Sequence, residues 1–207
     1  MEILKINTWT CLLAFFFMAS VNAQTPEQQQ KAFKQSYVDE YKADYAAAIS
    51  DLQRVYKADS YECNLRLGWL NYSLKKYTVS MDYYQKAIDL RKYSVEARLG
   101  YINTANAAKA FDKAYAKYEE ILKIDPYNST ANYWVGVNYY SVKKYDIAAK
   151  YFELVVNMYP FDYDGNYMLG WTYLELGRTG EAKLLFEMAL LNKPDDAAAK
   201  AALIKCK

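Results

Sequence analysis

The sequence of 207 residues contains no histidine, and it has only 7 glycines, 4 prolines and 3 cysteines. The absence of histidine removes the usual general base near neutral pH and the commonest metal ligand. No pair of nucleophile and base can be proposed, so we expect neither an enzyme nor a protein that needs a metal or cofactor. Scarce glycine and proline also disfavour an all-β fold with many turns, and the composition favours helices.

The charges give little indication of a partner. The sequence has 26 basic and 24 acidic residues, a net charge of +2, and no long basic block. A protein that binds nucleic acid needs a concentrated basic surface, because its cations must replace the counterions of the phosphates. We therefore expect no nucleic-acid partner.

Long apolar runs are missing, apart from a short one near the N-terminus. The stretch from Cys11 to Ala19 is about half of the roughly 20 residues that span a bilayer. Lys5 precedes it, and the small-residue cleavage site Val21-Asn22-Ala23 follows it, a pattern typical of a secretory signal peptide. We expect residues 1–23 to be this signal, which makes the protein exported, periplasmic or associated with the cell envelope, and not membrane-spanning after cleavage. A retained anchor is the alternative.

The dominant signal in the rest of the chain is an internal repeat. Three evenly spaced prolines, Pro126, Pro160 and Pro194, define its interval of 34. The same interval separates three further pairs, namely Gly136 and Gly170, Ala148 and Ala182, and Phe152 and Phe186. Such a period is typical of solenoids, in which helical units stack on their neighbours. It divides the chain into units at 61–94, 95–128, 129–162 and 163–196.

Each unit is expected to contain two helices. In the last unit an apolar stripe at helical spacing marks the second helix, and it consists of Ala182, Leu185, Phe186, Ala189 and Leu190. Pro194 then ends this helix, and Gly177 and Gly180 indicate the turn before it. Small residues at the recurring Gly and Ala positions let two helices approach closely and admit an aromatic ring.

These residues resemble the tetratricopeptide repeat family, whose pattern is a Leu-Gly pair and a Tyr on the first helix, then Tyr, Ala, an aromatic residue, Ala and Pro. Unit 163–196 matches with Leu169-Gly170, Tyr173, Ala182, Phe186, Ala189 and Pro194. The resemblance implies an all-α fold, a right-handed superhelical solenoid of about five antiparallel helix pairs plus a C-terminal capping helix. It also implies a non-enzymatic scaffold for protein–protein interactions, whose first helices line the concave side.

Three segments depart from the regular pattern. Residues 24–60 are predicted to form a divergent N-terminal helix pair, which opens with a capping box from Thr25 to Gln28, and residues 197–207 a capping helix. In unit 95–128 the Leu99-Gly100 pair falls two residues early. We expect the first helix of that unit to be irregular, either longer or shifted, with any unusual groove geometry around 95–105.

The resemblance places the binding face in the concave groove. Counting from the matched glycines, the predicted groove residues are Leu65, Arg66, Trp69, Tyr72, Arg98, Tyr101, Tyr133, Trp134, Val137, Tyr140, Tyr167, Met168, Trp171 and Leu174. Trp69 and Trp171 are the expected anchors, because Trp provides a large contact area at low entropic cost. The alternative is that these rings, which recur at helical spacing, pack in the core.

The predicted ligand is an extended peptide or a partner protein, whose identity the sequence does not give. Family members that bind chaperone tails hold carboxylates with a clamp of Lys, Asn and Arg, but Leu65 and Trp69 stand in the matching places here. Two alternatives remain open. One is an envelope glycan-binding protein that uses Trp69, Trp134 and Trp171 as stacking platforms, and the other is a structural subunit that assembles through the solenoid ends.

The signal-peptide interpretation predicts the N-terminus of the mature protein. Mass spectrometry of the protein isolated from its native host should find a chain that begins at Gln24. An Ala23→Lys variant, which removes the small residue before the cleavage site, should keep the leader. Finding Met1 on the mature wild-type chain would contradict the interpretation.

Overall fold

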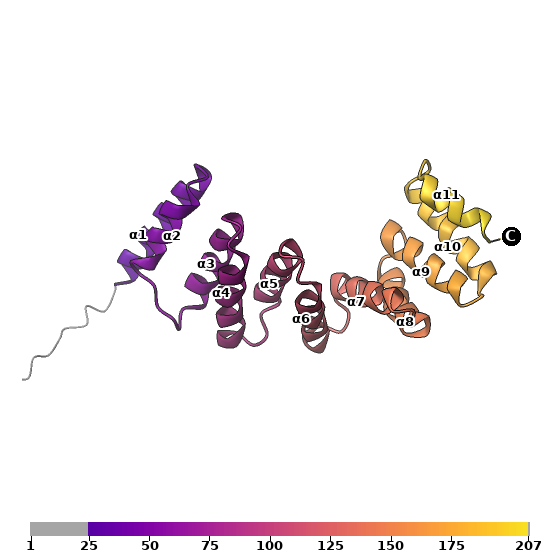
Figure 1. Ribbon diagram of the computed structural model, residues 1–207, viewed down its shortest axis with the longest axis horizontal. Coiled ribbons are helices and arrows are strands. Elements are labelled where there is room, and N and C mark those ends of the chain that lie inside the picture. Colours follow the sequence, from indigo (N-terminus) through magenta and orange to yellow (C-terminus); the bar gives the residue numbers. More distant parts are fainter. Residues whose placement is uncertain (1–24, 207) are drawn as a thin grey trace, which may run out of the picture.

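The computed structural model describes residues 25–206, which form eleven α-helices and no strand (Figure 1). Ten of these helices form five consecutive pairs, each joined by a short turn. The pairs are α1 (Pro26–Tyr41) with α2 (Tyr45–Gln53), α3 (Tyr61–Ser73) with α4 (Tyr77–Leu90), α5 (Val95–Ala107) with α6 (Phe111–Ile124), α7 (Ser129–Ser141) with α8 (Tyr145–Met158), and α9 (Tyr163–Glu175) with α10 (Thr179–Asn192). The last helix, α11 (Ala197–Ile204), packs on α10. The predicted all-helical fold of five pairs and a final helix is confirmed.

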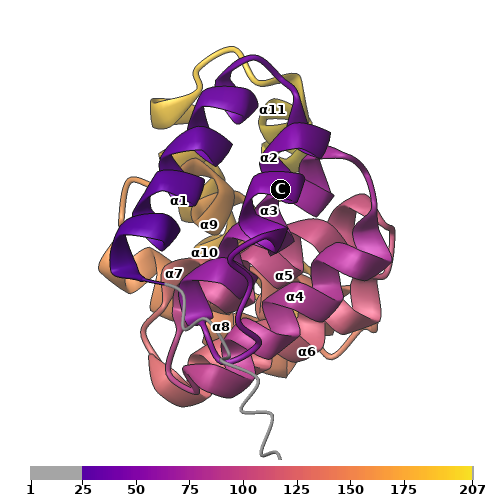
Figure 2. The same cartoon turned by 90° about the vertical axis from the view of Figure 1, so that its left-hand side faces the viewer.

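The pairs stack in the order of the chain. Each second helix contacts its own first helix and the first helix of the next pair. Figure 1 shows this succession from α1 to α11, and Figure 2, turned by 90°, shows α1 and α2 in front of the later pairs. Buried apolar residues form separate clusters between neighbouring helices instead of one central core. This nearest-neighbour packing is the architecture of a solenoid.

Capping side chains fix where the first helices begin. The residues directly before α3, α5, α7 and α9 are, in this order, Ser60, Ser94, Asn128 and Asp162. In each of them the side-chain oxygen accepts a hydrogen bond from the backbone N–H three residues later. Such a cap satisfies one of the N–H groups that lack a partner within the helix. The four caps follow one another at the interval of the repeat, and Asp196 continues the series before α11.

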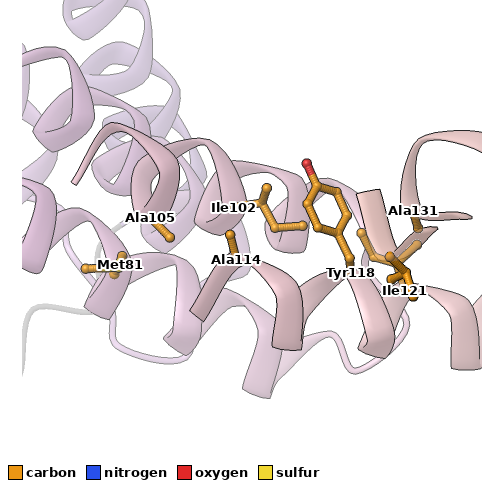
Figure 3. Packing of buried hydrophobic residues seen from close by; sticks show 8 residues of the cluster. Met81, Ile102, Ala105, Ala114, Tyr118, Ile121 and Ala131 are labelled. Atoms are coloured by element: carbon orange, nitrogen blue, oxygen red, sulfur yellow. The ribbon is translucent and has the colours of Figure 1, made fainter. Parts of the chain in front are cut away.

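The first helix of unit 95–128 is regular. Helix α5 has 13 residues, as α3, α7 and α9 do, and it begins in the same repeat frame. The expectation that it is longer or shifted is therefore wrong. That expectation took Gly100 as the counterpart of Gly68 and Gly136, but the corresponding position holds Ile102. Ile102 belongs to a buried cluster that includes Tyr118 of α6 (Figure 3).

In the last two pairs, an aromatic ring of the second helix packs directly on a glycine of the first. A Cβ atom at Gly136 would lie 2.8 Å from Cε1 of Phe152, and a Cβ atom at Gly170 would lie 2.8 Å from Cε1 of Phe186. Both rings are fully buried. No side chain fits at the two glycines, and their absence lets the helices approach closely.

The described chain begins with the predicted capping box. Oγ1 of Thr25 accepts a hydrogen bond from the backbone N–H of Gln28, and Oε1 of Gln28 accepts one from the backbone N–H of Thr25. The predicted signal at 1–23 lies outside the described residues. Among residues 25–206, no helix combines the length and the apolar character that a membrane span requires.

Replacing Gly136 by alanine tests the contact between ring and glycine. We expect the Gly136→Ala variant to lose about 1–3 kcal/mol of unfolding free energy, because the added Cβ overlaps the ring of Phe152. Gly180→Ala is the matched control, since a Cβ at Gly180 meets nothing within 4 Å and alanine favours a helix. Urea unfolding followed by circular dichroism measures both variants. Equal free energies of unfolding in the two would refute the tight contact.

Candidate functional site

The predicted groove residues differ widely in their exposure. Trp69 and Trp134 are 43% and 39% exposed, whereas Arg98 is buried. The other predicted residues are half-buried, namely Leu65, Arg66, Tyr72, Tyr101, Tyr133, Val137, Tyr140, Tyr167, Met168, Trp171 and Leu174. A candidate site therefore has to be found from the cavities that these residues line.

Three of the predicted residues line one cavity between the first helices of the first three pairs. Leu65, Arg66 and Trp69 contribute to it from α3, and its volume is about 500 Å³. The other lining residues come from α1, α3, α4 and α5, and they are Phe33, Tyr37, Tyr61, Glu62, Tyr84, Glu96 and Gly100. We call this space the α3 cavity.

Helix α1 holds Arg66 in the wall of the α3 cavity. Nη1 of Arg66 pairs with Oε2 of Glu40, and Nη2 donates to the backbone oxygen of Ser36 at 3.3 Å. The guanidinium lies 3.9 Å from the centroid of the Tyr37 ring. Because the Arg66 side chain is only 10% exposed, water screens this ion pair weakly. Glu40 therefore compensates the positive charge of Arg66.

The same glutamate positions Trp69. Nε1 of Trp69 donates a hydrogen bond to Oε1 of Glu40. The indole also stacks on the ring of Tyr72, with centroids 5.6 Å apart and planes inclined by 29°. Trp69 is thus fixed in orientation although it remains 43% exposed. A ring held in this way loses little conformational entropy when a ligand packs on it.

Gly100 gives Tyr84 of α4 access to the α3 cavity. In the repeat frame, Gly100 of α5 corresponds to Arg66 of α3. A Cβ at Gly100 would lie 2.2 Å from Cε1 and 2.4 Å from Cζ of Tyr84, while a Cβ at Gly68 would lie 3.0 Å from the same ring. The ring therefore sits between α3 and α5 with its phenol end beside Gly100. Burial raises the pKa of Tyr84 above its usual range, so the hydroxyl stays protonated.

Arg98, one of the predicted groove residues, is buried and does not line the α3 cavity. It is 7% exposed, its Nε donates to Oε2 of Glu120 at 3.0 Å, and its Nη1 donates to the backbone oxygen of Ser94 at 2.9 Å. Asn132 occupies the same position in α7 and donates to the oxygen of its own helix cap at 3.0 Å. Arg98 therefore fastens the start of α5 and pairs with α6.

Tyr101 also lies away from the α3 cavity. It packs on two buried clusters, and Nζ of Lys117 from α6 lies 5.2 Å from the centroid of its ring. Both predictions for α5 counted from Gly100, which stands two residues before the frame position of the other glycines. In the correct frame Asn103 corresponds to Trp69, and it is exposed.

Two of the predicted residues of α7 line a second, smaller cavity. Tyr133 and Trp134 lie in a space of about 400 Å³, together with Ser129, Thr130, Val155, Tyr159, Asp162 and Asp164. Trp134 stacks on Tyr118 with ring centroids 6.3 Å apart. Burial raises the pKa of Tyr133 to about 12, so it too stays neutral. Its ring meets Phe152 edge-on at 5.9 Å, which ties this part of the surface to the core.

The predicted residues of α9 mainly contribute to packing. Tyr167, Met168 and Trp171 lie against the buried cluster between the last pairs, as do Val137, Tyr140 and Leu174. The ring of Trp171 meets Phe186 at 5.6 Å, and Nζ of Lys205 lies 4.8 Å above it. The core interpretation of the aromatic stripe therefore describes this end of the solenoid better than the binding interpretation does.

Sequence reasoning missed the contribution of α1. The interval from Tyr37 to Trp69 is 32, and the turn residues Ala43 and Lys75, with φ angles of 59° and 58°, show the same interval. The first pair thus repeats at a slightly shorter interval than the later pairs do. A search at that interval would have placed Tyr37 beside α3 and drawn attention to Glu40 one turn later.

The residues of the site give no indication of a metal. Within residues 25–206, no group of three or more His, Cys, Asp or Glu side chains is placed to hold an ion. The α3 cavity contains mainly aromatic rings, two glutamates and a compensated arginine. Such a surface can bind side chains of a ligand, but the residues that line it include no paired nucleophile and base.

Comparison with known proteins identifies similar sequences and folds. Two family profiles, both described as tetratricopeptide repeat, match residues 33–95 and 139–206. Comparison with curated protein sequences finds no match.

Several solved structures share the fold. A structure titled MamA AMB-1 superposes with a TM-score of 0.67 at 17% identity, covering 86% of this chain and 98% of its own. Another MamA structure gives 0.68 at 20% identity, covering 84% and 96%. A tetratricopeptide repeat protein from Parabacteroides merdae gives 0.71 at 16% identity, covering 87% and 72%. At these identities the likeness concerns the fold alone.

Removing Glu40 tests the arrangement of Arg66 and Trp69. We expect Glu40→Ala to lower the free energy of unfolding by about 1–3 kcal/mol, because it leaves the mostly buried guanidinium of Arg66 without its counter-charge. The matched control is Glu187→Ala on the exposed face of α10, which should change stability by less than about 0.5 kcal/mol. Chemical unfolding measures both. The arrangement is refuted if the two variants are equally stable.

Proposed function

Because the chain belongs to the tetratricopeptide repeat family, we propose that it binds an extended segment of a partner protein along its first helices, with the α3 cavity as the main contact. Solenoids of this kind are protein-interaction scaffolds, and their function lies in the surface that stacked repeats present. The proposed ligand lies across α1, α3 and α5, which all contribute to this cavity.

One observation carries the proposal, the exposed and fixed ring of Trp69. Its Nε1 is satisfied by Glu40 and one face is covered by Tyr72, so the ring keeps its orientation without a ligand. Exposed aromatic residues beside a concave, mostly apolar space are the usual anchors of protein interfaces. Leu65 and Phe33 extend the apolar lining next to it.

The chemistry of the cavity disfavours a ligand that is held by its C-terminal carboxylate. The one arginine in the lining is Arg66, and Glu40 compensates its charge. Leu65 and Trp69 occupy places where a carboxylate clamp would need polar donors. We therefore propose recognition of internal side chains of an extended segment instead of recognition of a chain end.

The cellular location is part of the same proposal. Residues 1–23 have the charge, apolar stretch and small residues of a secretory signal, and we propose that the mature protein acts in the periplasm or at the cell envelope. The partner is then a protein that is exposed in that compartment.

The alternative of a glycan ligand receives less support from the geometry. Stacking on a sugar uses the face of an aromatic ring, and one of the two faces is already covered in Trp69 by Tyr72 and in Trp134 by Tyr118. The third tryptophan, Trp171, is half-buried, with a lysine over its ring. These contacts favour a protein ligand, which can pack against ring edges as well as faces.

Truncation of Trp69 tests the proposed function. Tagged full-length chain would be expressed in the native host, cross-linked and captured, and the recovered proteins quantified by mass spectrometry. We expect Trp69→Ala to reduce recovery of the specific partner at least roughly tenfold, since loss of an interface anchor costs about 2 kcal/mol or more.

The control for this experiment is Tyr93→Ala. Tyr93 is 84% exposed in the loop after α4 and does not line the α3 cavity, so its loss should leave recovery unchanged. Equal recovery of the same partners by Trp69→Ala and Tyr93→Ala would exclude the α3 cavity as the main contact. Recovery of untagged copies of the chain alone would instead support the alternative of a structural subunit that assembles through the solenoid ends.

A further inference from the structure

The charges around the α3 cavity are unbalanced. Glu62 and Glu96 both line it, and neither forms an ion pair with another residue among 25–206. Oε2 of Glu96 accepts a hydrogen bond from the hydroxyl of Tyr61 at 3.0 Å, which holds this carboxylate at the cavity edge. The positive charge of Arg66 is already compensated by Glu40. The cavity therefore presents two carboxylates that form no ion pair with any described residue.

The rest of the lining presents aromatic rings. Tyr37, Tyr61, Trp69 and Tyr84 all contribute to the α3 cavity. The faces of such rings carry partial negative charge, and they attract an ammonium or guanidinium group within about 6 Å. The protein already uses this interaction next to the cavity, where the guanidinium of Arg66 lies over the ring of Tyr37.

A mostly buried tyrosine whose hydroxyl has no partner also lines the cavity. Tyr84 is only 4% exposed, and no described residue forms a hydrogen bond with its hydroxyl. The phenol end lies beside Gly100, at the lining that Gly100 shares with Glu96. A protonated phenol can accept a hydrogen bond from an N–H group while it donates to a carboxylate or to water. Covering an unpaired hydroxyl is costly, so a ligand with N–H donors gains by meeting it.

From these three observations we infer that the α3 cavity recognises a cationic side chain, lysine or arginine, of the bound segment. The ammonium or guanidinium group lies among the aromatic rings, faces Glu62 and Glu96, and donates to the hydroxyl of Tyr84. This inference rests on the proposed function, because it names the side-chain chemistry that the same site selects.

Other side chains fit the site less well. An aspartate or glutamate would bring a third negative charge to Glu62 and Glu96 in a partly desolvated space. An apolar side chain would leave the hydroxyl of Tyr84 without a partner and would desolvate both carboxylates without compensation. Both costs act against the wrong ligand, which is how a site of this kind obtains specificity.

Peptide selection on the immobilised full-length chain tests the inference. The probe is a displayed library of random dodecapeptides, and the enriched sequences are synthesised and measured by fluorescence anisotropy. We expect the enriched peptides to share a lysine or arginine at one position. Replacing that residue by norleucine should weaken binding roughly tenfold, as expected for loss of a partly desolvated cation–π and ion-pair contact.

Variants of the chain locate this cation. The double variant Glu62→Gln/Glu96→Gln and the variant Tyr84→Phe should each weaken the lysine peptide several-fold. Neither should weaken the norleucine peptide, because that peptide no longer has to cover an unpaired hydroxyl or two carboxylates. Glu187→Gln should affect neither peptide. A loss of affinity that only the lysine peptide shows is a coupling between its ammonium group and the replaced side chain. A general disturbance of the fold would weaken both peptides. Peptides that depend on Trp69 but lack a shared cation, or lysine peptides insensitive to these variants, overturn the inference and leave the proposed function standing. If no enriched peptide loses affinity in Trp69→Ala, both are overturned.

Discussion

The fold depends on the close approach between the two helices of a pair. In the last two pairs, a ring on the second helix lies directly against a glycine on the first, and no side chain would fit between them. This approach brings the apolar faces of the pair together, and the next pair covers what remains. Capping residues at a constant interval then start each first helix at the same place, so the surfaces of the first helices form a continuous face.

The candidate site arises where this regular scheme is varied. In unit 95–128, Ile102 takes the place of the glycine that receives the ring, and the glycine appears instead at position 100. The ring of Tyr84 from the preceding pair then extends between α3 and α5 and reaches the cavity. The N-terminal end of the groove is therefore open and chemically varied, whereas the rings at the C-terminal end pack on the core. The proposed binding contact and the packing contacts thus lie at opposite ends of the same aromatic stripe.

The period of the repeat was sufficient to predict the helix pairs and their order, because the residues that repeat are those that pack. The period is insufficient for unit 95–128. Ile102 occupies the position of the packing glycine there, and Gly100, two residues earlier, imitates the Leu-Gly pair of the other units. The helix caps give the correct frame of this unit, because Ser60, Ser94 and Asn128 keep the interval of 34. The 34-residue period alone does not predict the role of Glu40, because α1 precedes α3 by a different interval and the contacts of Glu40 depend on how α1 lies against α3.

The place of Tyr84 has a consequence for how the solenoid unfolds. In a nearest-neighbour description, the stability of a repeat array is the sum of an intrinsic free energy for each repeat and an interfacial free energy for each boundary. The rings of Phe152 and Phe186 lie on a glycine of their own repeat, but the ring of Tyr84 touches glycines of two, Gly68 and Gly100. Unfolding of the repeat with Gly68 or of the repeat with Gly100 removes the packing contacts on one side of the Tyr84 ring. The contacts of this ring therefore contribute to both the intrinsic and the interfacial free energy, and we expect the second and third repeats to unfold together.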